Sequence, residues 1–179
     1  MQLAKSFEFE HDFPVSKLMW APNNSIRHDL LATCNQYVRI WQVEEGSAQK
    51  LWDVKSAQSK QTGPLTCFDW NQDRPNILAT ASIDNICTVW DLEHMTVVQQ
   101  LIAHESSVNS ITFANEDAKF ATGGDDGSVR VFDMRNLNYS TIIYEARNPI
   151  LHVLWNRDLP MQLALVTKND NRVIILDVR

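Results

Sequence analysis

The feature that most constrains this chain of 179 residues is a pattern that occurs four times along it. Each occurrence begins with a short apolar run that ends in an aromatic residue and closes with a run rich in β-branched residues. The opening aromatic residues lie roughly 40 to 50 residues apart; they are Trp20, Trp70, Phe113 and Trp155. A repeat of this length predicts small supersecondary units that bury their apolar surface by stacking on their neighbours.

The closing runs have the composition of β-strands. Val, Ile, Thr and aromatic residues, which suit a pleated and packed surface, dominate these runs; they cover residues 38–43, 87–92, 129–134 and 173–178. A turn residue precedes each run, namely Asn35, Asp84, Asp126 and Asp170. Asn and Asp tolerate the positive φ that tight hairpins require. No long amphipathic helix is evident, so the sequence predicts an all-β chain.

A period near 40–45 residues with several short strands per unit is typical of a WD-repeat β-propeller. We therefore expect a single domain over residues 1–179, with about four blades of four antiparallel strands in a partial or small ring. The repeats fall at residues 15–54, 64–102, 108–145 and 150–179.

The two ends of the chain bear on whether such a ring closes. Phe7 and Phe9 alternate with polar residues over positions 6–10, as in a half-buried strand, and this segment precedes any first strand. The fourth unit reaches Arg179 without an outer strand. We expect residues 3–10 to be the outer strand of a preceding blade, or of the fourth blade, where it would close the ring. The sequence does not decide between a closed ring of four blades and a segment of a longer ring.

One unit carries polar residues that fit a buried network. In WD repeats the turn Asp bonds to a His ahead of the first strand, and a Ser or Thr and the Trp complete the network. His104, Thr122 and Asp126 fit the first three roles, whereas Phe132 replaces the Trp and removes its N–H donor. We expect the other units to lack the His and the network to be structural, because satisfied buried networks fix a fold. The equivalent turn residues of the second and fourth units are Asp84 and Asp170.

Composition argues against several classes of protein. The formal net charge of −6 disfavours direct nucleic-acid binding, which depends on clustered Lys and Arg. No run of about 18 apolar residues and no apolar leader occurs, so we expect no membrane association and an intracellular location. The cysteines lack the spacing of a disulfide framework or a zinc site, so we expect buried thiols; they are Cys34, Cys67 and Cys87.

Catalytic motifs are also missing. His104-Glu105 begins like a zinc-protease motif, but Val108 stands where the second His would be. The glycine-rich stretch 123–127 is not followed by the Lys and Ser or Thr of a phosphate-binding loop. We expect a protein that is not an enzyme and needs neither cofactor nor metal.

An Asp-x-Arg sequence follows two of the closing runs, as Asp133-Met134-Arg135 and as Asp177-Val178-Arg179. Two interpretations of such a pair are open. It is a structural ion pair at a blade corner, which contributes little stability at a surface, or its arginine docks a partner's carboxylate. Asp133, Arg135, Asp177 and Arg179 are therefore the candidate protein-binding residues.

The strings PLTCFDWN, SIDNICTVWDLE, DGSVRVFDMR, STIIYE and VIILDVR resemble the transparent-testa-glabra type of WD-repeat protein and its cullin-4-associated animal relatives. The resemblance covers almost the whole chain. Members of that family look like seven-bladed rings of about twice this length, within the usual propeller range. The chain resembles blades two to five of such a ring.

The resemblance implies a non-catalytic scaffold of the cytoplasm and nucleus. Family members join MYB and basic helix-loop-helix transcription factors or carry dual-specificity tyrosine-regulated kinases. Others serve the cullin-4 ubiquitin ligase, whose adaptor reads a W-D-x-R box; Phe132-Asp133-Met134-Arg135 matches its Asp and Arg. The resemblance thus implies a scaffold, with a substrate receptor of a cullin-4 ligase or a truncated, non-functional propeller as alternatives.

Overall fold

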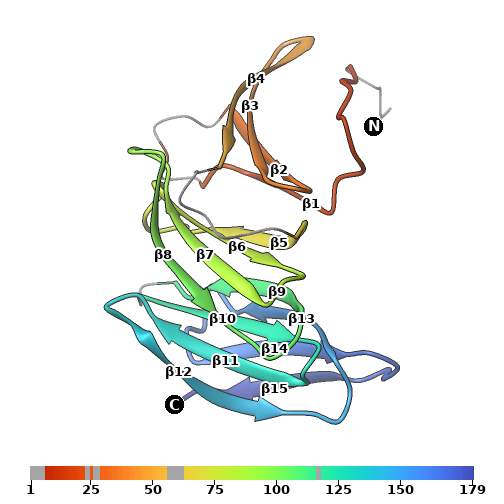
Figure 1. The fold of residues 1–179 in the computed structure, drawn as a ribbon, viewed down its shortest axis with the longest axis vertical. Coiled ribbons are helices and arrows are strands. Elements are labelled where there is room, and N and C mark those ends of the chain that lie inside the picture. The colour runs from red at the N-terminus through yellow and green to blue at the C-terminus, as the bar shows by residue number, and fades with distance from the viewer. Residues whose placement is uncertain (1–6, 23–24, 26–28, 56–62, 116–117) are drawn as a thin grey trace.

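The computed structural model describes residues 7–22, 25, 29–55, 63–115 and 118–179. Within them the chain forms four antiparallel sheets, each a simple meander that we call a blade (Figure 1). Blade 1 contains β1 (Lys17–Trp20), β2 (Leu30–Cys34), β3 (Val38–Glu44) and β4 (Ser47–Val54). Blade 2 contains β5 (Leu65–Trp70), β6 (Ile77–Ser82), β7 (Ile86–Asp91) and β8 (Thr96–Ile102). Blade 3 contains β9 (Val108–Phe113), β10 (Lys119–Gly124), β11 (Ser128–Asp133) and β12 (Asn136–Glu145), and blade 4 contains β13 (Ile150–Trp155), β14 (Gln162–Thr167) and β15 (Val173–Asp177).

Turn residues with positive φ join the second and third strands of three blades. Asn85 (φ 67°) and Asn169 (φ 60°) serve blades 2 and 4, and Gly127 (φ 78°) serves blade 3. A Cβ at Gly127 would lie 2.3 Å from the carbonyl oxygen of Ala146, so only glycine fits this turn. The expected Asn- and Gly-containing hairpin turns are therefore present.

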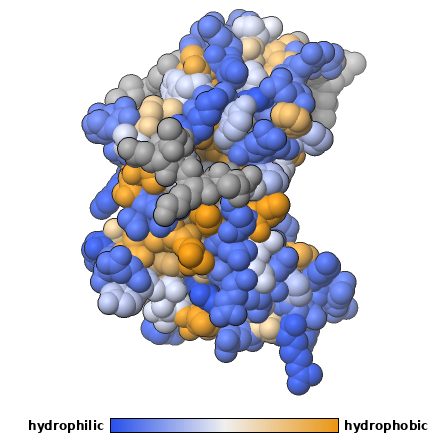
Figure 2. Space-filling model, viewed as in Figure 1, coloured by the Kyte–Doolittle hydropathy of each residue, from blue (hydrophilic) through white to orange (hydrophobic). Residues whose placement is uncertain are grey.

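The core lies between the blades, which stack face to face. One apolar cluster joins blades 1 and 2, a second joins blades 2 and 3, and a third joins blades 3 and 4. The three cysteine thiols are free and buried in this core, as expected. On the face shown in Figure 2, apolar side chains reach the surface mainly around the middle of the stack. The prediction of an all-β chain built from antiparallel blades is confirmed over the described residues.

The expectation for the N-terminal segment is wrong over the part that the structure describes. Residues 7–10 form no strand, and residues 3–6 lie outside the described residues. Backbone pairing needs a neighbouring strand edge, and residues 7–10 instead lie beside blade 1, where the Phe9 ring is 4.8 Å from the Trp41 ring. Figure 1 shows an open arc with blades 1 and 4 at its two ends, so residues 7–10 do not close the ring.

Blade 4 has three strands among the described residues, with β15 at its edge. No helix in the described structure is long and apolar enough to cross a membrane.

Candidate functional site

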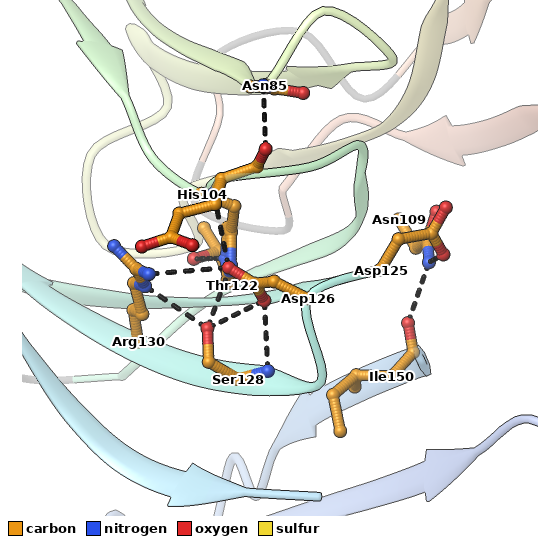
Figure 3. Close-up of polar contacts among 10 residues, drawn as sticks. Asn85, His104, Asn109, Thr122, Asp125, Asp126, Ser128, Arg130 and Ile150 are labelled. Atoms are coloured by element: carbon orange, nitrogen blue, oxygen red, sulfur yellow. Dashed lines mark hydrogen bonds and ion pairs between the residues drawn. The ribbon is translucent and has the colours of Figure 1, made fainter. Parts of the chain in front are cut away.

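His104 is the centre of a buried polar network in blade 3 (Figure 3). Its Nδ1 lies 3.0 and 3.1 Å from the two carboxylate oxygens of Asp126, and its Nε2 lies 2.8 Å from the Thr122 hydroxyl. Ser128 adds two hydrogen bonds to Asp126, from its backbone N–H at 3.0 Å and its hydroxyl at 2.8 Å. A Cβ at Gly124 would lie 2.6 Å from His104 Nδ1, so the ring needs a glycine beside it. The structure thus brings His104, Thr122 and Asp126 together.

These contacts define the protonation of the network. The Asp126 carboxylate only accepts, so His104 carries its proton on Nδ1 and accepts the Thr122 hydroxyl proton at Nε2. Burial lowers the pKa of His104 below its ordinary value, against the attraction of Asp126, and the ring is neutral. Burial opposes ionisation of Asp126, but the Ser128 hydrogen bonds and His104 outweigh it and lower the pKa of Asp126 to about 2. In this blade the network ends at Thr122, because Phe132 stacks on Phe120 and offers no N–H.

Blade 1 contains a second histidine of this kind, which the sequence analysis missed. Trp41 Nε1 donates to the Thr33 hydroxyl at 2.8 Å, and His11 Nε2 lies 3.1 Å from the same hydroxyl. The other ring nitrogen of His11 donates to the Phe13 carbonyl at 2.8 Å, where blade 3 uses an aspartate. The expectation that only His104 fills this position is therefore wrong.

Sequence spacing contains a signal for His11. His11 precedes Trp20 by the same number of residues as His104 precedes Phe113. The signal is weak because no Gly or Ala precedes His11 and because Asn35, not Asp, stands at the turn. Asn35 donates to the Pro14 carbonyl instead of meeting the histidine.

Asp84 and Asp170 stay outside the His104 network. Asp84 accepts a hydrogen bond from the Ser82 hydroxyl and another from the Gly63 N–H at 3.0 Å, so it fixes its own turn in blade 2. Asp170 is paired with the exposed Arg172, whose Nη2 is 2.7 Å away. The turn position is shared among the blades, but its partner differs in each.

The two predicted Asp-x-Arg pairs are formed on one rim of the arc. Asp133 ends β11 and Asp177 ends β15, at corresponding corners of blades 3 and 4. Arg135 Nε is 2.8 Å from Asp133 Oδ1, and Arg179 Nε is 3.0 Å from both carboxylate oxygens of Asp177. We call these four residues the Asp-Arg rim.

Hydrogen bonds from Arg135 lower the pKa of Asp133 to about 2, and Arg179 lowers the pKa of Asp177 in the same way. The guanidinium groups themselves face solvent, since the Arg135 and Arg179 side chains are 67% and 78% exposed. Each arginine is thus held in a fixed orientation at the surface, which is what bidentate recognition of a carboxylate requires.

A groove of about 420 Å³ lies beside this rim, between the outer parts of blades 3 and 4. Its apolar wall includes Val131, Ile143 and Leu176, and Asp177 and Arg179 form part of its lining. A charged pair next to an apolar groove suits a protein partner better than a small polar metabolite.

One cluster in the described part of the chain has the residue types of a metal site. Donor atoms of Asp91, Glu93 and His94 lie within 4.8 Å of one another at the surface. The Asp91 carboxylate already accepts the backbone N–H groups of Glu93 and His94 and faces His94 Nδ1 at 2.9 Å. The hydrogen bond to His94 lowers the pKa of Asp91 and raises that of His94. This arrangement is a self-contained turn.

Comparison with known proteins agrees with this geometry. The family described as "WD domain, G-beta repeat" matches residues 54–91 and 95–133. The second match runs from just before β8 to the end of β11, so one sequence repeat joins an outer strand to the next three strands. Residues 54–133 thus contain WD repeats, and the four blades give the chain the fold of part of a WD-repeat β-propeller.

Its similarity to individual proteins is more specific. The chain is 47% identical over 178 residues to the DDB1- and CUL4-associated factor 7 homolog of Dictyostelium discoideum, covering 96% of this chain and 54% of that protein. It is 33% identical over 207 residues to a WD repeat-containing protein of Saccharomyces cerevisiae, covering 93% and 39% of the two chains. An uncharacterized WD repeat-containing protein of Schizosaccharomyces pombe is 36% identical over 157 residues, with coverage of 82% and 35%. The chain spans about half the length of these relatives, or less.

Proposed function

We propose that the chain is a non-catalytic protein–protein interaction scaffold that acts in the cytoplasm and nucleus and uses no cofactor. Its partners are transcription regulators of the MYB and basic helix-loop-helix classes or dual-specificity tyrosine-regulated kinases. This part of the proposal rests on the resemblance to the transparent-testa-glabra and cullin-4-associated type of protein, in which the chain corresponds to blades two to five. The rigid stack of blades supports this proposal, because binding residues sit on loops that a rigid scaffold positions. The Asp-Arg rim is the part of that scaffold best built for a partner.

A second candidate function is that of a substrate receptor of a cullin-4 ubiquitin ligase. The observation that favours it is the position of Arg135 and Arg179 at equivalent corners of adjacent blades, each oriented by its own aspartate. The Dictyostelium relative takes its name from DDB1 and CUL4. We propose that Arg135 and Arg179 contact a DDB1-type adaptor and that the apolar groove beside Arg179 adds area to that contact.

Co-purification and ubiquitination separate the two functions. The tagged chain is expressed in cells and purified with its bound proteins, and these are tested for DDB1, for CUL4 and for kinases. A scaffold retains regulators or kinases that are not ubiquitinated in its presence. A substrate receptor retains DDB1 and CUL4 and increases ubiquitination of a second bound protein.

The two-arginine variant Arg135→Ala/Arg179→Ala tests the proposed rim. Arg172→Ala is the matched control, because Arg172 is equally exposed and bidentate on its own aspartate but lies at the opposite end of β15. Loss of the adaptor in the double variant but not in the control supports the proposal. A folded wild-type chain that retains neither regulators, nor kinases, nor the adaptor contradicts both candidate functions and leaves the non-functional propeller.

A further inference from the structure

Every blade has a residue equivalent to Arg135 and Arg179, which we call its corner residue. It stands two positions after the residue that pairs with the first residue of the second strand of the blade. In blades 2, 3 and 4 that paired residue is an aspartate, and it accepts the backbone N–H of the corner residue at 2.9, 2.9 and 3.2 Å. The corner residues of blades 1 to 4 are Glu44, Glu93, Arg135 and Arg179.

The charge of the corner residue therefore changes sign between blades 2 and 3. Glu44 and Glu93 are exposed, as the two arginines are. Blades 2, 3 and 4 share the backbone hydrogen bond at the corner, so the corner can be built with either charge. A carboxylate on a partner is repelled by the glutamates of blades 1 and 2 and meets an exposed guanidinium on blades 3 and 4.

A second difference lies in the loop that joins the first two strands of a blade, which blades 2 and 4 build in the same way. Trp70 and Trp155 each donate from Nε1 to the carbonyl of a proline in the loop, at 2.7 Å. The asparagine after each tryptophan accepts two backbone N–H groups of its loop, at 2.9 to 3.1 Å. The second of these N–H groups belongs to Arg74 in blade 2 and to Leu159 in blade 4.

The loop of blade 4 does not need a leucine at this position, because Arg74 occupies it with the same backbone hydrogen bonds. Leu159 is 52% exposed, and Arg74 is exposed as well. Blade 3 follows blade 2 and leaves Arg74 exposed, so the exposure of this position does not depend on a following blade. Leu159 lines a hollow of about 230 Å³ together with Met161 and Arg179. Apolar surface therefore lies directly beside a corner arginine.

We propose that the partner surface that meets the Asp-Arg rim carries carboxylates beside an apolar side chain. The carboxylates accept hydrogen bonds from Arg135 and Arg179, and the apolar side chain packs on Leu159. The occupant is the DDB1-type adaptor, so this inference rests on the proposed function and adds the chemistry of the adaptor's surface. Charge complementarity places the adaptor on blades 3 and 4, because the corners of blades 1 and 2 have glutamate at the same position.

Equilibrium binding of a purified DDB1-type adaptor to the purified chain tests the apolar contact. Leu159→Gln should weaken binding at least fivefold, and the loss should be similar in about 50 mM and about 500 mM salt, since salt screens charges and not apolar contacts. Arg74→Gln is the matched control, because it places the same side chain at the same position of the blade 2 loop, and it should leave binding unchanged. Both variants should keep the urea midpoint of the wild type.

Reversal of a corner charge tests the carboxylates. Arg135→Glu gives blade 3 the corner residue that blade 2 has in Glu93, so the corner backbone accommodates it. In about 50 mM salt it should weaken binding at least fivefold more than Arg135→Ala does, and the difference should shrink in about 500 mM salt.

Three results overturn the inference. If Leu159→Gln binds as the wild type does while Arg135→Ala/Arg179→Ala binds weakly, Leu159 is not a contact and the proposed function stands. If Arg135→Glu and Arg135→Ala bind equally, no carboxylate of the adaptor lies at this corner. Absence of binding by the folded wild type overturns the inference together with the proposed adaptor contact.

Discussion

Two aspartates of blade 3 share a pKa of about 2, but different partners lower it in different surroundings. Asp126 is 11% exposed and is held ionised from within, by Ser128 and by the buried ring of His104. Asp133, at the other end of β11, is held ionised by Arg135 in contact with solvent.

The comparison shows that a depressed pKa does not by itself separate structure from function. The Asp126 network is closed, since each polar group in it finds a partner within the blade. The Asp133 pair lies at the surface, since the Arg135 side chain is 67% exposed. Substitutions around Asp126 should therefore change stability, and substitutions around Asp133 should change binding.

The largest expected effect is that of His104→Ala. The substitution leaves the Thr122 hydroxyl and the Asp126 carboxylate without their buried partner, and we expect the free energy of unfolding to fall by about 2–4 kcal/mol. Urea denaturation measures the change. The neighbouring Glu105→Ala is the control, because its side chain is exposed and the change should stay within about 0.5 kcal/mol. Equal effects of the two substitutions would contradict the structural role of His104.

The blade 1 network should contribute less. Trp41→Phe removes the indole donor to Thr33, and we expect a loss of about 1 kcal/mol. His11→Ala should cost a similar amount, because the side chain is half-buried and makes one hydrogen bond to Thr33. The double variant should lose less stability than the sum of the two single losses, since both side chains act through the one Thr33 hydroxyl. Strict additivity would mean that His11 and Trp41 are not coupled.

Stability should also depend on pH through His104. Its folded pKa lies below the ordinary value of 6.5, so the unfolded chain takes up the proton first. The stability from neutral His104 is fully present above about pH 6.5 and is lost as the pH falls towards the folded pKa. The stability that ionised Asp126 contributes is lost at lower pH, as the pH falls from the ordinary pKa of 3.8 through the folded pKa of about 2.

The variant His104→Gln isolates the first of these windows. Between pH 7.5 and pH 5, urea denaturation should show that the free energy of unfolding falls more steeply for the wild type than for the variant. The contribution of His94, whose pKa is raised, is the same in both proteins and cancels in the comparison. Parallel curves would show that His104 does not titrate differently in the folded chain.

The smallest expected effect on stability is that of Arg135→Ala. The pair is at the surface, where an ion pair contributes little and salt screens it, so the urea midpoint should not change measurably. A clear loss of stability would show that Arg135 supports the blade, which would weaken its assignment to partner binding.

The repeat pattern predicted the blades well because each strand has its own local signal. Apolar runs ending in Trp20, Trp70, Phe113 and Trp155 and the turn residues before each closing run gave fold class and strand order. The His104 network was also accessible, since its three residues occupy fixed positions of one repeat.

The contacts that were missed depend on what lies next to a segment. The alternation around Phe7 and Phe9 indicates a half-buried segment, but it cannot indicate whether a neighbouring strand is present for backbone pairing. In the structure Phe9 packs on Trp41 and residues 7–10 form no strand. His11 was missed because its spacing signal is weak: no Gly or Ala precedes it, and its Nδ1 donates to the Phe13 carbonyl instead of to a turn aspartate. The different partners of Asp84 and Asp170 likewise depend on Gly63 and Arg172, which vary between the repeats.

The most direct test of the proposed scaffold is the equilibrium binding of a purified DDB1-type adaptor to the purified, folded chain. We expect saturable binding that Arg135→Ala/Arg179→Ala weakens at least tenfold and that Arg172→Ala leaves unchanged, while all three proteins share one urea midpoint. Absence of binding by the folded wild type, or equal weakening by both variants, would contradict the assignment of the Asp-Arg rim as the docking surface.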